Sequence, residues 1–518
     1  MTYIVEQKIK GRIYLYEVTS FWDKNKKQSR QKRKYIGSKE RIYNKSGTKL
    51  KKPIKTKPSN FTSKSYGDVF LIDYLQKELG LYDFIKQEFY DYKEILALTA
   101  FMIQESSASY LFPYWHEEHY LSNVKKLNSQ SLSEIYECIG RNERGRLNFL
   151  KDWSNYVNPS SGIYYDITSI SSYSTNIESV EWGYNRDKEQ LPQINTGIIQ
   201  CRKTSLPISY NVHPGSIVDV TTLKNAIKTF DSFNLKNLFF ILDRGFCSIS
   251  NILQMYKNKM SFIQPLSFSL KKAKDLVSKY KSKICKSKNV FCYNEEILYH
   301  VCDKIELNKI KFNTHIFYNE KASINYKHYL YKAIIEIEKN IEKLNPFKNK
   351  KECEKYIENN IIGKYKKYFK ATNKTITRNL KEIENAIFRA GTIILLLHGE
   401  EIDKIQLLEI YRNRDSIEKS INSLKNHMDT KRIRAHNQDI ANGRLFVKFI
   451  ALIVITKIMS VIKKDKKLKK YSINEIMAEL KKLKINTFDE NCKFLTEFTK
   501  KQKLIFKAFK IDIEKINL

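Results

Sequence analysis

The chain has 518 residues, with 93 Lys and Arg against 56 Asp and Glu, a formal net charge of +37. Its length exceeds that of a small stapled scaffold, and its 42% hydrophobic and 13% aromatic residues exclude a disordered basic tail protein. A charge this large opposes compaction, so it indicates a polyanionic partner, either nucleic acid or an anionic membrane.

A membrane span or a secreted form is not expected. The longest apolar stretch, residues 446–462, is interrupted by Lys448, Thr456 and Lys457, which predicts a buried amphipathic helix. The N-terminus lacks the continuous apolar core of a signal peptide. None of the eight cysteines forms a CxxC pair, so we expect reduced structural thiols in a cytoplasmic protein rather than a disulfide framework or a zinc ribbon.

Residues 1–60 hold 18 Lys and Arg against 4 Asp and Glu. Apolar and polar residues alternate around Gly11, which predicts a β-hairpin arm whose basic tail, residues 24–34, contacts DNA phosphates. A solvated linker is the alternative. Residues 61–158 have helical spacing and are predicted to form a helical, DNA-binding domain. His116 and His119 in this domain lack HExxH order and are interpreted as structural.

After the break at Pro159–Gly162 the sequence becomes rich in strand candidates, and residues 159–267 are predicted to form the first part of an α/β core. Asp166 lies within the first of these strands, and Asp243 ends a later one, where active sites of α/β sheets are found. The predicted strands cover 163–167, 195–200, 206–212, 238–242 and 260–265, with a helix over 220–230.

Residues 268–390 are rich in lysine and are predicted as an insertion domain that does not continue the sheet, with a helix over 330–344. Residues 391–462 are expected to complete the core with a buried strand at 391–397 and a long helix that begins near Asp403. Residues 463–518 are predicted as a basic helical tail.

The long helix, over residues 404–428, carries a polar stripe beside its apolar face. At 100° per residue, Tyr411, Arg414, Glu418 and Lys425 fall within about 60° of one another. An acid, two cations and a phenol aligned at the edge of a core face indicate a ligand. A solvated helix surface is the alternative for Glu418 and Lys425.

Three carboxylates suit in-line attack on a phosphodiester, which two divalent cations serve well. Asp166, Asp243 and Glu418 supply hard oxygen ligands from distant parts of the chain, which predicts a site for two Mg²⁺ ions, with Mn²⁺ as a substitute. Arg414 and Lys425 are predicted to bind DNA phosphate, and Tyr411 to position a phosphate or a water. Taken singly, Asp166 is also explained as a solubility device and Asp243 as a turn former.

Tyr411-(2)-Arg414-(3)-Glu418-(6)-Lys425 resembles the Y-R-E-K signature of the DDE transposases of bacterial insertion sequences, in their long-chain branch. The contexts of Asp166 and Asp243 and the segments 183–187 and 191–193 also resemble that family. The resemblance implies an RNase H-like core, a mixed sheet flanked by helices, and a large insertion between Asp243 and Glu418. The insertion departs from the family because it is partly helical rather than mainly β.

The resemblance implies a cut-and-paste DNA transposase that cleaves the ends of an insertion sequence and joins them to a target. Its partners would be double-stranded DNA with terminal inverted repeats, and a second copy of the chain in the DNA complex, with a hairpin intermediate. The alternatives are a structure-selective nuclease without joining and a non-catalytic DNA-binding factor. Trp182 is interpreted as a packed aromatic rather than a base-stacking residue, and His398 and His436 as packing or capping residues.

Overall fold

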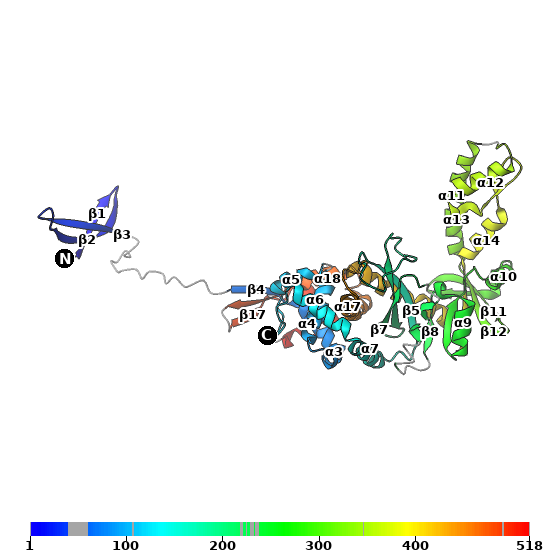
Figure 1. Cartoon of the computed structure of the whole chain (residues 1–518), viewed down its shortest axis with the longest axis horizontal. Coiled ribbons are helices and arrows are strands. Elements are labelled where there is room, and N and C mark those ends of the chain that lie inside the picture. The colour runs from blue at the N-terminus through cyan, green and yellow to red at the C-terminus, as the bar shows by residue number, and fades with distance from the viewer. Residues whose placement is uncertain are drawn as a thin grey trace. The chain divides into compact units, whose positions relative to one another are not determined.

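The computed structural model describes residues 2–39, 61–105, 108–217, 221–223, 225–227, 233, 238–344, 347–488 and 492–516 (Figure 1). Residues 221–223 and 225–227 of the helix predicted over 220–230 are helical, whereas the other residues of that helix and residues 40–60 of the predicted arm lie outside the described residues. The chain divides into two compact units, of which the first comprises residues 1–62 and 487–492 and the second residues 63–486 and 493–518.

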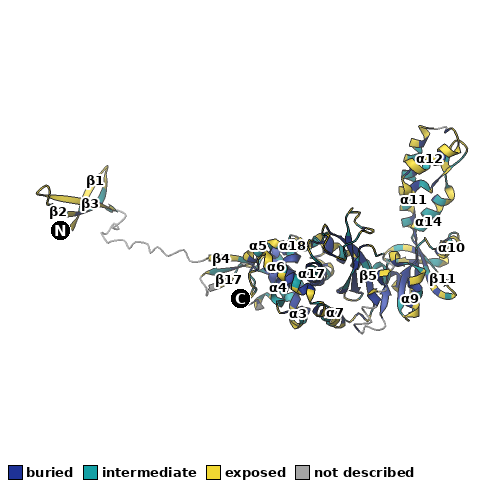
Figure 2. Cartoon of the chain, in the orientation of Figure 1, coloured by how far each residue is buried: buried dark blue, intermediate teal, exposed yellow. Residues whose placement is uncertain are grey.

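The first unit contains an antiparallel sheet of β1 (Thr2–Ile9), β2 (Arg12–Asp23) and β3 (Gln28–Ser38). Strands β1 and β2 meet at Lys10 and Gly11, whose φ angles of 45° and 80° form the tight turn. Most of the basic run pairs with β2 as a third strand, so the expectation of a basic tail beyond a hairpin is wrong. Strand β3 is largely exposed, as Figure 2 shows.

The second unit begins with a short strand and a group of helices, which confirms the predicted helical region. These elements are β4 (Phe61–Ser65), α2 (Gly67–Glu78), α3 (Leu81–Glu88), α4 (Tyr92–Gln104), α5 (Phe112–Glu118), α6 (Ser129–Arg141) and α7 (Glu143–Val157). Their apolar faces share one core with α17 (Gln438–Lys464).

Helix α17 is long and apolar enough to cross a membrane, with a window of mean hydropathy 2.4, yet 72% of that window is buried inside the protein. It packs on α4 and α6, which confirms the prediction of a buried helix. The crossing with α6 requires glycine, because a Cβ on Gly443 would lie 1.9 Å from the carbonyl oxygen of Tyr136. Figure 2 shows α17 as one of the most buried elements.

A nine-stranded mixed sheet forms the centre of the second unit, in the order β10-β11-β12-β15-β9-β8-β5-β6-β7. Strands β5, β6 and β7 are antiparallel, whereas β8 and β9 run parallel to β5. All six strands predicted for the core are present: β5 (Ile163–Ser171), β6 (Gln193–Cys201), β7 (Pro207–Pro214), β8 (Phe239–Ile241), β9 (Ser261–Pro265) and β15 (Thr392–His398). Helices α9 (Ile249–Lys257) and α10 (Lys271–Tyr280) accompany them.

The expectation that residues 268–390 do not continue the sheet is wrong for their first part. Strands β10 (Val290–Tyr293), β11 (Glu296–Leu307) and β12 (Ile310–Tyr318) extend the sheet beyond β15. Polar residues such as Lys304, Glu306, Lys311 and Asn313 are exposed and alternate with buried ones in β11 and β12, because only one face of this part of the sheet is buried. Because of this alternation with polar residues, the three strands were not distinguished from the helical segments in the sequence.

The remainder of the insertion has its own apolar core, separate from the sheet. Leu330, Ile334 and Ile341 of α11 (Glu320–Glu342) are buried in it, so the predicted helix is present but begins ten residues earlier. Arg378 pairs with Glu338 of α11 at 2.6 Å. The other elements are α12 (Lys350–Asn360), α13 (Gly363–Lys366), β13 (Phe369–Ala371), β14 (Ile376–Arg378) and α14 (Leu380–Ala390).

The C-terminal segment is not wholly helical as predicted. It holds α18 (Ile473–Leu480) and α19 (Lys500–Ala508), but β16 (Lys484–Phe488) pairs with β17 (Cys492–Leu495) and with β4. The predicted helix over 404–428 is also interrupted: α15 (Lys404–Arg412) and α16 (Asp415–Asn422) are separate, and residues 423–427 form a π-helix.

Candidate active site

Two neighbouring strands bring the predicted aspartates to the same level of the sheet. Asp166 lies in β5, and Asp243 lies two residues beyond the end of β8. Strand β8 runs parallel to β5 with Tyr164 opposite Ile241, and continuing this register places Asp243 opposite Asp166. Glu418 comes from α16, which packs on β5 and β6.

A single guanidinium joins all three acids. The Arg414 side chain lies 3.7 Å from Oδ2 of Asp166 and 3.3 Å from Oδ1 of Asp243, and it also pairs with Glu418. The Arg414 side chain is only 13% exposed, whereas Glu418 is 51% exposed. The three carboxylates predicted from sequence therefore converge, and Arg414 lies among them rather than beside them.

The charges of this cluster act on one another. The pKa of Asp166 is raised to about 6, mainly by burial; the backbone N–H of Ile167 and the charge of Arg414 oppose this rise, and the charge of Asp243 contributes to it. Burial lowers the pKa of Arg414, but the charges of the three acids outweigh it, so the net shift is upward. Arg414 thus compensates the mutual repulsion of the carboxylates.

Tyr411 lies at the edge of the same cluster. Burial raises the pKa of its hydroxyl, the charge of Arg414 lowers it, and the charges of Asp243 and Glu418 raise it. Tyr411, Arg414 and Glu418 remain on one side of the chain because the break between α15 and α16 is a tight turn. In that turn the backbone N–H of Arg414 donates to the carbonyl of Tyr411.

Lys425 is placed differently from the other members of the predicted stripe. Its ammonium lies 2.6 Å from Oδ2 of Asp187, and its side chain is 9% exposed. Lys425 lies in the π-helical turn, where 100° per residue no longer describes the rotation. The projection at 100° per residue, which aligned Lys425 with Arg414, therefore does not apply from Ser423 onward.

The segment between β5 and β6 also contributes to the site. The charge of Arg186 acts on Asp166, and the Arg186 guanidinium donates to Oγ of Ser169 at 3.1 Å. The neighbouring Asp187 holds Lys425. In the sequence, this segment is marked only by its resemblance to the family, and no role was predicted for Arg186.

Trp182 in the same segment is 69% exposed, so its interpretation as a packed aromatic is wrong. Tyr184 is 79% exposed. His398, in contrast, packs among the rings of Tyr256, Phe262 and Phe312, as predicted. His119 is buried, with its ring nitrogens against the carbonyl of Trp115 and the carboxylate of Asp68.

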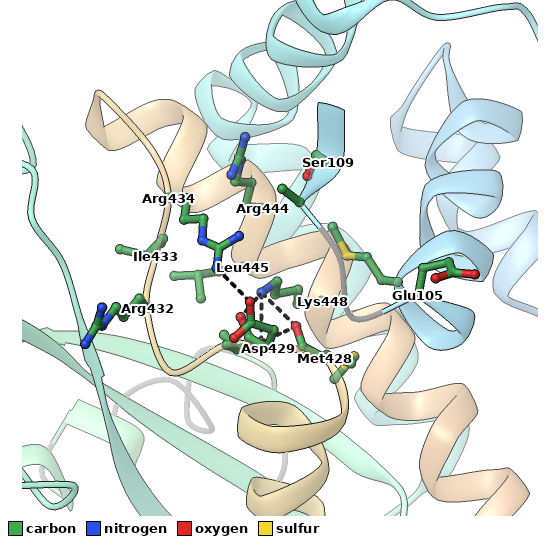
Figure 3. Close-up of a pocket in the computed structure, with 13 residues that line it drawn as sticks. Glu105, Ser109, Met428, Asp429, Arg432, Ile433, Arg434, Arg444, Leu445 and Lys448 are labelled. Atoms are coloured by element: carbon green, nitrogen blue, oxygen red, sulfur yellow. Dashed lines mark hydrogen bonds and ion pairs between the residues drawn. The ribbon is translucent and has the colours of Figure 1, made fainter. Parts of the chain in front are cut away.

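A small cavity of about 40 Å³ lies beyond the π-helix, lined by residues of α17, of the segment before it, and of the end of α4 and the residues that follow it (Figure 3). The Lys448 ammonium donates to Oγ1 of Thr430 at 2.9 Å and to two backbone carbonyls. Arg434 pairs with Asp429 at 2.9 Å. Arg432 and Arg444 also line this cavity, so its net charge is positive.

A larger cleft of about 1150 Å³ runs beside α15 and α16. Its lining includes seven Arg and Lys residues: Arg202, Lys203, Arg412, Lys419, Lys463, Lys464 and Lys469. This composition fits a polyanion.

The carboxylate cluster also fits divalent metal ions. Three carboxylates within reach of one guanidinium can turn toward a common cation, and their hard oxygens are the ligands that Mg²⁺ and Mn²⁺ prefer. Such a site on a mixed α/β sheet is typical of enzymes with phosphoryl-transfer chemistry.

The comparisons with known proteins agree with this chemistry. The family model described as "Transposase DDE domain" matches residues 157–454, more than half of the chain, and the chain therefore belongs to this family. The protein is a DNA transposase, an enzyme that cleaves DNA and transfers its strands, and the family generally uses divalent metal ions.

Among solved structures, the chain is similar to one described as "Cryo-EM structure of piggyBac transposase synaptic complex with hairpin DNA (SNHP)". The sequence identity is 9%, the TM-score is 0.36, and the match covers 80% of this chain and 76% of that chain. No curated protein gives a significant match.

Proposed function

We propose that this transposase performs cut-and-paste transposition of an insertion sequence, with Asp166, Asp243 and Glu418 as the ligands of two Mg²⁺ ions. The contact of all three acids with the one guanidinium of Arg414 carries the proposal. Bound there, the ions would activate the attacking oxygen and stabilise the leaving one. The order of β5 to β9, three antiparallel strands followed by two parallel ones, supports an RNase H-like core.

Arg414 has two tasks in this proposal. Without metal it neutralises the three carboxylates, which would otherwise repel one another. Once the carboxylates bind metal, the guanidinium becomes available to hold a phosphate of the DNA strand as a bidentate donor. Tyr411 orients the same phosphate through its hydroxyl.

Lys425 has an indirect role in this proposal, because its ammonium already pairs with Asp187 and is not free to contact DNA phosphate. The pair ties the segment that carries Arg186 and Trp182 to the end of the active-site helix. Exposed Trp182 is then available to stack on a base near the cut. A direct contact of Lys425 with phosphate, as the Y-R-E-K resemblance implies, requires this pair to open.

DNA binding beyond the site involves three positive surfaces: the exposed strand β3, the cavity of Figure 3 and the cleft beside α16. We expect double-stranded DNA with terminal inverted repeats as substrate, a homodimer in the DNA complex, and a bacterial cytoplasmic location.

The test uses DNA that flanks the coding region as substrate, with Mg²⁺. Glu418→Gln is expected to lower end cleavage at least about 100-fold, because a lost metal ligand costs several kcal/mol in the transition state. Glu401→Gln is the matched control, since Glu401 is exposed and does not line the cleft beside α16. Full cleavage by Glu418→Gln would refute the assignment, and cleavage without strand transfer by the unaltered protein would favour the nuclease.

A further inference from the structure

A second cluster of metal-ligating side chains lies on the part of the sheet that sequence analysis did not recognise. His300 and Cys302 are two residues apart in β11, and therefore point to the same face. His315 of β12 lies directly opposite Cys302 in the antiparallel register. The turn at Asn308 and Lys309, with φ angles of 46° and 66°, fixes this register. Figure 1 shows β11 and β12 beside each other.

The ligand atoms of the three residues are already close together. Nε2 of His300 lies 3.1 Å from Nδ1 of His315, and Sγ of Cys302 lies 3.7 Å from each nitrogen. A tetrahedral Zn²⁺ with bonds of about 2.0–2.1 Å to nitrogen and about 2.3 Å to sulfur sets these edges at roughly 3.4 Å and 3.6 Å. All three separations match those edges to within about 0.3 Å.

Neighbouring rings hold the imidazoles in this orientation. The two imidazole rings are stacked, with centroids 5.3 Å apart and an interplanar angle of 26°. Phe317 and Phe291 pack on His300 at 4.7 Å and 6.3 Å. Burial lowers the pKa of both imidazoles.

We propose that His300, Cys302 and His315 bind a Zn²⁺ ion, with the fourth coordination position open to solvent beside the exposed Cys302. A hydrogen bond between the two histidines alone explains the nitrogen contact but gives no reason for a thiol equidistant from both nitrogens. The nitrogen and sulfur ligands select zinc, whereas the three carboxylates select Mg²⁺ or Mn²⁺, so the two sites take different ions.

The proposed zinc site lies near the start of the active-site helices. Strand β12 pairs with β15, which leads into Asp403 and α15. The charges of Lys404 and Asp403 act on His300, and the Asp403 charge also acts on His315. Zinc would therefore add a positive charge where α15 begins, and would fasten β11 to β12 at mid-strand.

The experiment titrates the chelator-treated protein with Co²⁺ in excess Mg²⁺, which would occupy the carboxylates if they bind metal as proposed. We expect one equivalent of tetrahedral Co²⁺ with a thiolate-to-cobalt charge-transfer band, displaced by one equivalent of Zn²⁺. Cys302→Ser is expected to abolish the band. Cys292→Ser, at another exposed cysteine on the neighbouring strand β10, is expected to retain it.

His315→Gln provides a second variant, and its zinc affinity should fall at least about 100-fold. Circular dichroism of each variant checks that the fold is kept. The proposal is overturned if no charge-transfer band forms, if the band survives in Cys302→Ser, or if Cys292→Ser loses it as well.

Discussion

Replacing Arg414 by glutamine is expected to strengthen metal binding and to slow DNA cleavage. In the unaltered protein, a metal ion must displace the guanidinium from the three acids before it binds them. The variant lacks this competitor, so it should bind Mn²⁺ more tightly. It also lacks the proposed phosphate ligand, so it should cleave DNA more slowly.

The magnitude follows from the ion pairs. At 3.3 Å and 3.7 Å, each pair of Arg414 with an aspartate has a Coulomb energy of about 4.5–5 kcal/mol at an effective dielectric constant of about 20. Asp243 is 36% exposed and Glu418 51% exposed, so solvent reduces the net compensation to about 1–2 kcal/mol in total. The expected tightening of Mn²⁺ binding is therefore roughly tenfold.

The assay is calorimetric titration of full-length protein with Mn²⁺ in the absence of DNA, together with end cleavage. Arg412→Gln is the matched control for the Mn²⁺ titration, because that guanidinium pairs with Glu296 at 3.3 Å and lies over the ring of Tyr293. Equal Mn²⁺ affinity in the two variants, or weaker binding in Arg414→Gln, would refute competition between Arg414 and the metal.

Three further predictions concern stability, each measured by urea unfolding. Asp187→Asn should lower the free energy of unfolding by about 2–3 kcal/mol, because it leaves the buried Lys425 unpaired. Its control is Asp415→Asn, in an exposed pair with Lys419, which should lower the free energy of unfolding by less than about 0.5 kcal/mol. Equal losses in the two variants would contradict the importance of the Asp187–Lys425 pair. Gly443→Ala should cost about 3 kcal/mol or more because its Cβ meets a backbone carbonyl, whereas Gly363→Ala, with open space around it, should cost little; a tolerated Gly443→Ala would mean that α6 and α17 are not so close. Burial lowers the pKa of Lys448 to about 7, so folding releases a proton between pH 7 and 10.5, and the stability of the unaltered protein should rise with pH in that range by about 1 kcal/mol per unit relative to Lys448→Met. A flat difference would show that the three acceptors around its ammonium keep Lys448 charged.

The core strands and the three acids could be predicted from sequence because the signals are local. Short apolar runs such as residues 238–242 have few alternatives to a buried strand, and a carboxylate at the end of such a run is conspicuous. The convergence of Asp166 and Asp243 then follows from the parallel pairing of β5 with β8.

Other features depend on contacts between distant residues. Strands β11 and β12 look solvated until the pairing of β11 with β12 and of β12 with β15 is known. The π-helical turn shifts Lys425 out of the polar stripe without any Pro or Gly to mark it. The histidine and cysteine cluster arises only when β11 and β12 pair, because its ligands follow no compact motif in the chain.

The Mn²⁺ position in crystals of the protein, located by anomalous diffraction, tests the central claim most directly. The predicted result is anomalous density bound by Asp166, Asp243 and Glu418, with the guanidinium of Arg414 withdrawn from at least one carboxylate. Mn²⁺ bound elsewhere, while Arg414 still contacts all three acids, would contradict the assignment of these residues as the metal site.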